Sequence, residues 1–137
     1  MWWIYALLSA FFAALTAIFA KVGIKGVDTD LATAIRTVVI LVLAWSIAIF
    51  RGGAASVHTL SKQNIIFLCL SGIATGLSWI FYFKALQLGK VSQVAPVDKM
   101  SVAISIILAV IFLGEPLTIK AAAGALLIIG GTLVLIL

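Results

Sequence analysis

The sequence predicts an all-α integral membrane protein with five transmembrane helices, and two observations carry this prediction. First, 65% of the 137 residues are hydrophobic and only 9% are charged, with a mean hydropathy of +1.35. Soluble domains carry about 25% charged residues. Second, short polar turns divide the chain into five apolar runs, each close to the roughly 20 residues that a helix needs to cross the hydrocarbon core.

The same composition excludes several classes of function. Nine basic residues give a net charge of +5, but they are scattered between apolar runs and form no basic patch for nucleic acid. They fit membrane-edge anchors and topology signals instead. The single Cys69 and the single His58 have no partners nearby for a disulfide or a metal site. No motif of a hydrolase, redox enzyme or nucleotide-binding enzyme is present, so we expect no enzyme activity, no metal and no cofactor.

The first predicted span covers residues 2–24. It contains no charge before Lys21, and it opens with Trp2 and Trp3. A signal peptide would carry a basic segment ahead of its apolar run, and this one does not. Tryptophans at the start of a span are typical of an interfacial anchor, so we expect a multi-pass protein of the cell membrane.

The second predicted span covers residues 31–50. Asp30 precedes it and is predicted to cap its N-terminus. Arg36 lies about a turn and a half inside this span. Its side chain either snorkels to the lipid headgroups or faces the helix bundle, and the sequence leaves both alternatives open.

The third predicted span, residues 65–86, follows a polar stretch from Arg51 to Asn64 that is expected to be the longest loop. Gly72 and Gly76 form a small-xxx-small pattern, which predicts close packing of helices in lipid. Trp79 and Tyr82 are three residues apart and share a face of this helix. They are interpreted either as packing and interfacial residues or as ligand contacts.

The fourth and fifth predicted spans cover residues 91–113 and 119–137. Gly114, Glu115 and Pro116 form the turn between them, and Thr118 is predicted to cap the fifth helix. Gly124 is a further predicted packing position. Ser101 and Ser105 share a face of the fourth span, where they either bond back to helix carbonyls or bind substrate.

Asp98 is the most informative residue of the fourth span. A helix that starts at Val91 puts Asp98 roughly 10 Å below the membrane edge, and an ionisable residue at membrane depth suggests a functional site. Pro96 predicts a bend, and a helix restarting there would favour an ionised carboxylate at its N-terminus. Lys99 points about 100° away on an ideal helix, so we expect the ion-pair partner of Asp98 elsewhere. The candidates for that partner are Lys21, Arg36 and Lys84.

Two interpretations of Asp98 follow from the sequence. It either forms a structural ion pair that holds the fourth helix in place, or it lines a substrate- or proton-binding cavity. The predicted binding residues in the second case are Asp98, Lys99, Tyr82, Trp79 and Ser101.

Five spans place the two ends of the chain on opposite sides of the membrane. Basic residues on the side of the first and third turns are Lys21, Lys25, Arg36, Lys84 and Lys90. Those on the other side are Arg51, Lys62 and Lys120. Under the positive-inside rule, this small difference leans towards an outside N-terminus and permits both orientations.

The ordered set of these residues resembles a single EamA-type repeat of the drug/metabolite transporter superfamily, over essentially the whole length. The resemblance rests on charged, aromatic, small and proline residues spaced along the five spans. They are Lys21, Arg36, Gly72, Ala74, Gly76, Trp79, Tyr82, Ala85, Leu86, Gly89, Ser92, Val94, Pro96, Asp98, Lys99, Ser101, Gly114, Glu115, Gly124 and Gly130. The acidic residue in the first span that marks the small multidrug-resistance relatives is absent, which argues against cationic-drug/proton exchange by their mechanism.

The resemblance implies one transmembrane domain over residues 1–137 that performs secondary transport or export of a small metabolite. Family members resemble two inverted repeats in tandem, and transporters commonly bind substrate between such repeats. One repeat therefore predicts a dimer, with a second copy or with a close homologue. The expected form is an antiparallel homodimer, with subunits inserted in opposite directions, and a parallel homodimer is the structural alternative. A non-transporting membrane subunit that scaffolds or stabilises a partner is the alternative. The expected partners are the lipid bilayer, a small-molecule substrate and a second copy, without nucleic acid.

Overall fold

The computed structural model describes residues 1–137, which form helices joined by short connections and contain no strand. Five helical segments are long and apolar enough to cross a membrane. The predicted fold class, an all-α membrane protein with five spans, is therefore confirmed. Contacts group the chain into two compact units, each described by itself below. The central unit is Ala20–Gln87, and the terminal unit combines Met1–Phe19 with Leu88–Leu137.

The observed helices follow the predicted spans closely, apart from a break in the fourth span. They are α1 Trp2–Gly23, α2 Thr29–Phe50, the 3₁₀ helix η1 Gly53–Thr59, α3 Lys62–Leu88, α4 Val91–Asp98, α5 Met100–Leu113 and α6 Ile119–Ile136. Together α4 and α5 make the fourth membrane span, Val91–Leu113. Whether the whole chain is a single domain stays a prediction.

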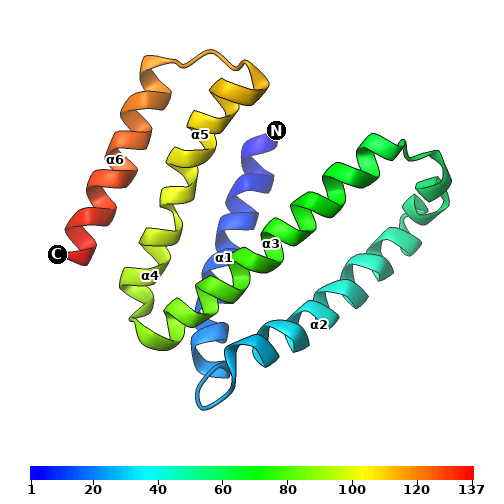
Figure 1. Ribbon diagram of the computed structural model, residues 1–137, viewed down its shortest axis with the longest axis horizontal. Coiled ribbons are helices and arrows are strands. Elements are labelled where there is room, and N and C mark those ends of the chain that lie inside the picture. Colours follow the sequence, from blue (N-terminus) through cyan, green and yellow to red (C-terminus); the bar gives the residue numbers. More distant parts are fainter. The chain divides into compact units, whose positions relative to one another are not determined.

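In the central unit, α2 and α3 form a helical hairpin joined by η1 (Figure 1). The N-cap of α2 is Asp28, and the prediction that Asp30 caps this helix is wrong. Asp28 Oδ1 accepts hydrogen bonds from the backbone N–H groups of Asp30 and Leu31, both at 3.0 Å. The helix begins at Thr29, so Asp30 lies in its first turn. A negative charge there interacts favourably with the positive end of the helix dipole.

The predicted loop between residues 51 and 64 is shorter than expected. Gly52, with a left-handed φ of 74°, reverses the chain after α2, and η1 occupies most of the stretch. The Ser61 hydroxyl then accepts from the N–H of Asn64 at 3.1 Å. This N-cap explains why α3 already begins at Lys62, because it satisfies a backbone donor that the first turn leaves unpaired.

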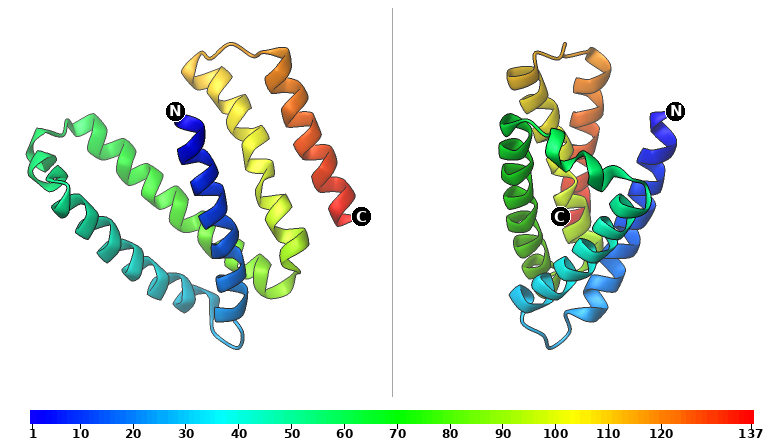
Figure 2. Two further views of the ribbon diagram at one scale, coloured as in Figure 1. Left: turned by 180° about the vertical axis from the view of Figure 1, so that it is seen from behind. Right: turned by 90° about the vertical axis from the view of Figure 1, so that its right-hand side faces the viewer.

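In the terminal unit, α6 runs beside α5 and α4 as the second arm of another hairpin (Figures 1 and 2). Gly114 ends α5 with a left-handed φ of 66°, a conformation that suits glycine at a helix C-terminus. The Thr118 hydroxyl accepts from the N–H of Ala121 at 3.1 Å, which confirms the predicted cap of the last helix.

The break in the fourth span lies at Lys99 rather than at Pro96. Pro96 is inside α4, and the helix restarts at Met100. The expectation of a helix beginning at Pro96 is therefore wrong, although a discontinuous span is present. Proline has no N–H to donate to the carbonyl of Ser92. A 3₁₀-type hydrogen bond from Lys99 N to Pro96 O, at 3.1 Å, closes the last turn of α4.

Four side-chain hydroxyls within the spans bond to their own helix, which suits a medium without water. Thr33 and Thr37 donate to the carbonyls four residues earlier at 2.8 Å, Ser46 does so at 2.7 Å and Thr75 at 2.9 Å. Few side chains are fully buried, and Phe83 and Leu86 are the largest of them. The remaining surface is dominated by aliphatic and aromatic residues, as expected for helices that face lipid.

Candidate functional site

In the central unit, the guanidinium of Arg36 lies against two aromatic rings of α3. Its Cζ is 4.5 Å from the centroid of the Trp79 ring and 4.9 Å from that of Phe83. Trp79 and Phe83 are four residues apart, so they stack on one face of α3 and present two π faces to α2. A cation over aromatic faces gains about 0.5–2 kcal/mol, with the larger values in desolvated sites. Arg36 therefore faces the bundle, which is one of the two alternatives that the sequence left open.

Two further polar contacts secure the same end of α3. The Lys21 ammonium donates to the carbonyl of Leu86, and Gln87 Nε2 donates to the carbonyl of Val27 at 3.0 Å. Leu86 belongs to the last turn of α3, whose carbonyls have no partner within the helix and carry the negative end of the dipole. A cation near those carbonyls is stabilising, so Lys21 holds the end of α1 to the end of α3.

An open hollow of about 490 Å³ lies at this end of the central unit. It is lined by Lys21, Val22, Ile24, Lys25, Gly26 and Gln87. Two of these residues are lysines and none is acidic. The hollow is therefore suited to a polar or negatively charged group rather than to a cation.

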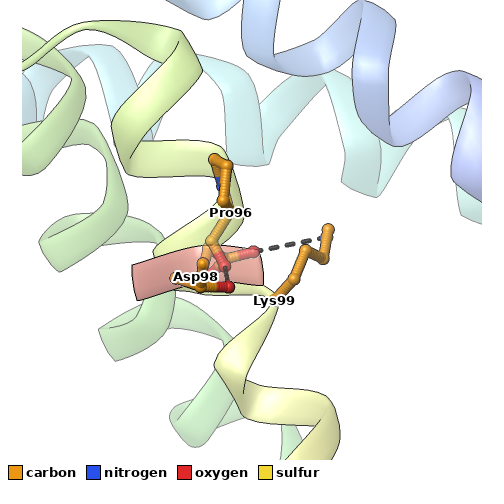
Figure 3. Close-up of polar contacts among 4 residues, drawn as sticks. Pro96, Asp98 and Lys99 are labelled. Atoms are coloured by element: carbon orange, nitrogen blue, oxygen red, sulfur yellow. Dashed lines mark hydrogen bonds and ion pairs between the residues drawn. The ribbon is translucent and has the colours of Figure 1, made fainter. Parts of the chain in front are cut away.

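In the terminal unit, Asp98 pairs with its neighbour Lys99, whose Nζ lies 3.3 Å from Asp98 Oδ2 (Figure 3). The prediction that Lys99 would not be the partner is therefore wrong. That prediction assumed an ideal continuous helix, whereas the break after Asp98 lets the flexible lysine side chain fold back. The Asp98 side chain is 35% exposed and that of Lys99 58%, so neither is enclosed by protein.

The carbonyl exposed by the break is satisfied by another helix. Thr132 of α6, itself 3% exposed, donates its hydroxyl to the carbonyl of Pro96 at 3.1 Å. Pro96 O also accepts from the N–H of Lys99. Because unpaired backbone groups are costly in lipid, this contact helps to hold the interrupted span against α6.

Ser101 and Ser105 line one side of a second open hollow, of about 390 Å³, in the terminal unit. The other lining residues are Val102, Ile106, Ala109, Val110, Glu115, Pro116, Leu117 and Ala121. Both serines are exposed. This places hydroxyls and one carboxylate along an otherwise apolar groove formed by α5, the turn after it and the start of α6, an arrangement that can hydrogen-bond a small ligand.

Comparison with known proteins decides the family. The EamA-like transporter family matches residues 1–137. The chain belongs to this family. It is also 47% identical over 134 residues to a Sinorhizobium sp. protein described as an "uncharacterized transporter in cobO 3'region", a match that covers 98% of this chain and 95% of the relative. No solved structure matches the chain.

The predicted binding residues of this EamA protein fall into both units. Trp79 and Tyr82 belong to the central unit, whereas Asp98, Lys99 and Ser101 belong to the terminal unit. In the terminal unit Asp98 forms an ion pair with Lys99, and in the central unit Trp79 contacts Arg36. A single site that combines all five residues stays a prediction.

The predicted packing glycines have open space around them within the chain. A Cβ built on Gly72, Gly76 or Gly124 would meet nothing within 4 Å apart from its own helix. Their proposed role in close helix packing therefore stays a prediction.

Two contributors were missed in the sequence. Phe83 was not singled out, although its position four residues after Trp79, on the same helix face, was the available signal. Thr132 was overlooked as a lone hydroxyl in an apolar helix. No group of three or more His, Cys, Asp or Glu side chains is placed to hold a metal ion, and the EamA family points to a transporter rather than an enzyme.

Proposed function

We propose that this EamA-family membrane transporter moves a small metabolite by secondary transport or export, and that it works as a dimer of five-span repeats in the cell membrane. The observation that carries the proposal is the Asp98–Lys99 ion pair inside the fourth span. Both side chains keep substantial exposure there. Asp98 is the eighth residue of that span, and so lies roughly 10 Å below its start.

An ion pair at this depth is stable when it faces protein or a water-filled cavity rather than lipid. A second copy can supply the missing surface and create a polar cavity between the two repeats. The exposed hydroxyls of Ser101 and Ser105 on α5 support the same assignment, because a polar groove facing lipid has no favourable partner. The Sinorhizobium relative supports a five-span unit, since the match leaves only 5% of its length uncovered.

The antiparallel arrangement is favoured by the odd number of spans and by the small difference in basic residues between the two sides. Reporters fused to the C-terminus, one active in the cytoplasm and one active outside, measure the orientation. Signal from both reporters supports an antiparallel homodimer. Signal from one side only, in a complex without an oppositely inserted homologue, contradicts it.

A parallel dimer is the structural alternative, and native Cys69 offers a direct test. This exposed residue lies three positions before Gly72 on α3. In-register α3 helices packed on their Gly72 and Gly76 faces would bring two Cys69 thiols together. Disulfide cross-linking that is lost in Cys69→Ser would therefore support the parallel arrangement.

A non-transporting subunit that stabilises a partner membrane protein is the second candidate function. It is favoured by the open form of both hollows, neither of which encloses a ligand within one chain. Counterflow into proteoliposomes, measured over amino acids, organic acids, amines, sugars and nucleosides, separates the two functions. Substrate-dependent flux that disappears in Asp98→Asn supports transport, and no flux with any class supports the second candidate.

A further inference from the structure

Arg36 is a cation inside a membrane span that has no anionic partner within the central unit. It forms no ion pair, since the single ion pair is that of Lys99 with Asp98. It contacts the π faces of Trp79 and Phe83, and the phenol of Tyr82 also interacts with it electrostatically. Charged side chains within membrane spans are almost always paired, so a lone arginine there indicates a missing partner.

The central unit itself cannot provide that partner. Its only acidic residues are Asp28 and Asp30, both at the start of α2. Asp28 accepts two backbone hydrogen bonds as the N-cap. Asp30 is exposed and forms no ion pair. The remaining residues of the unit, from 31 to 87, contain no carboxylate.

The geometry around Arg36 leaves its donors available. The aromatic rings contact the flat face of the guanidinium, whereas its N–H groups project from its edge in the plane. No buried side-chain nitrogen or oxygen in the structure lacks a hydrogen-bond partner. The unpaired N–H groups of Arg36 are therefore accessible to a ligand rather than sealed in the protein.

The rings also orient the arginine before any ligand arrives. Phe83 is 1% exposed, and its position is held by packing in the last turns of α3. A guanidinium stacked on fixed rings loses less side-chain freedom when it binds, and its fork matches the two oxygens of a carboxylate or phosphate. Lys21 and Lys25, which line the 490 Å³ hollow of the central unit, add further positive charge to the same unit.

We propose that Arg36 is an oxyanion-binding residue, held by Trp79 and Phe83, that recognises a carboxylate or phosphate group. This inference rests on the proposed function, and it makes the transported metabolite an organic anion. A lipid phosphate carries the same chemistry, so the experiment below includes an arm for each source.

The test uses Trp79 as a reporter of Arg36. Replacing Trp2, Trp3 and Trp45 with phenylalanine leaves Trp79 as the sole tryptophan, 4.5 Å from the guanidinium carbon. Its fluorescence is titrated in uncharged maltoside micelles with succinate, with inorganic phosphate and with the neutral succinamide, at constant ionic strength. A parallel titration adds phosphatidylglycerol in place of the soluble anions.

Three variants in this background test the role of the arginine. Arg36→Gln removes the charge, and we expect it to weaken oxyanion binding about tenfold or more, as for loss of a charge-assisted hydrogen bond. Arg36→Lys keeps the charge without the planar fork, so we expect its affinity for the oxyanion to lie between those of the parent and Arg36→Gln. Arg51→Gln, at the C-terminal end of the same helix, is the matched control and should bind like the parent.

A saturable response to succinate or phosphate that Arg36→Gln weakens supports an anionic metabolite. A response confined to phosphatidylglycerol, and equally weakened, supports the oxyanion site with a lipid headgroup as its source. The inference is overturned if succinamide matches succinate, if no oxyanion changes the emission, or if Arg36→Gln binds like the parent.

The readout needs no transport, so it separates this inference from the proposed function. Flux of an amine or a sugar that survives in Arg36→Gln would contradict the inference of an anionic substrate and would still support the transport function. A Trp79 response without any flux would support the oxyanion site and contradict transport.

Discussion

Replacing Thr132 with valine tests how the interrupted fourth span is held in place. Valine has nearly the same shape as threonine, so the substitution removes the hydroxyl and leaves the packing of α6 almost unchanged. In the structure that hydroxyl donates to Pro96 O at 3.1 Å from a side chain that is 3% exposed. It is the side-chain hydrogen bond that joins α6 to α4 across the break.

The expected loss is about 1 kcal/mol in the free energy of unfolding. Hydrogen bonds between side chains in membrane helices average roughly 0.6 kcal/mol and reach about 1.7 kcal/mol. Because Thr132 is buried, we expect its bond to contribute more than the average and less than the maximum. Pro96 O keeps the bond from Lys99 N, at 3.1 Å, so the carbonyl is not left unpaired and the larger penalty of an orphaned backbone group does not apply.

Unfolding in mixed micelles of maltoside and dodecyl sulfate measures this difference. Thr75→Val is the matched control, because Thr75 is exposed and its hydroxyl bonds only to Ser71 O of its own helix at 2.9 Å. We expect Thr132→Val to unfold more readily than the control, and Thr132→Ser to retain most of the stability. Amide exchange at Lys99 should also accelerate. Equal stability of the two valine variants would refute the role of this contact.

Three further outcomes follow from the structure. Phe83→Ala should destabilise the protein by about 3 kcal/mol or more, because it removes a buried ring, whereas Phe81→Ala, at a site 71% exposed, should have a small effect in the same micelles. Asp98→Asn should fold and dimerise but lose transport or its dependence on pH; normal transport at every pH would end the functional role of Asp98, and failure to fold would support a structural ion pair. Gly72→Leu and Gly76→Leu have open space around them, so they should preserve the helical content of the monomer; if the dimer is parallel and uses this face, they should also reduce cross-linking through Cys69. Unchanged dimer yield would show that these glycines are not at the interface.

The helices could be predicted closely because their signals are local. Apolar runs of span length, Gly114 in a left-handed turn and Thr118 at a cap all act within a few residues, and the structure bears them out. The errors were also local in origin. Asp28 and Asp30 are both good N-cap residues, and the sequence alone did not show that α2 starts at Thr29.

The candidate site was harder to predict because it depends on which helix faces meet. Arg36 and Trp79 are 43 positions apart in the chain, and no local pattern links a cation on α2 with an aromatic face on α3. Similarly, the rejection of Lys99 as the partner of Asp98 followed from ideal helix angles, which a break of a single residue invalidates.

The sequence by itself determined the class of this protein, the number and limits of its spans and its resemblance to EamA transporters, because hydropathy and turn chemistry act along the chain. Tertiary structure alone decided that Arg36 stacks on Trp79 and Phe83, that Lys21 binds the last turn of α3, and that Thr132 satisfies Pro96. These contacts depend on distances between helices. In lipid the hydrophobic effect does not favour one neighbouring helix over another, so hydrogen bonds and cation–π contacts of a few polar groups determine which helices meet.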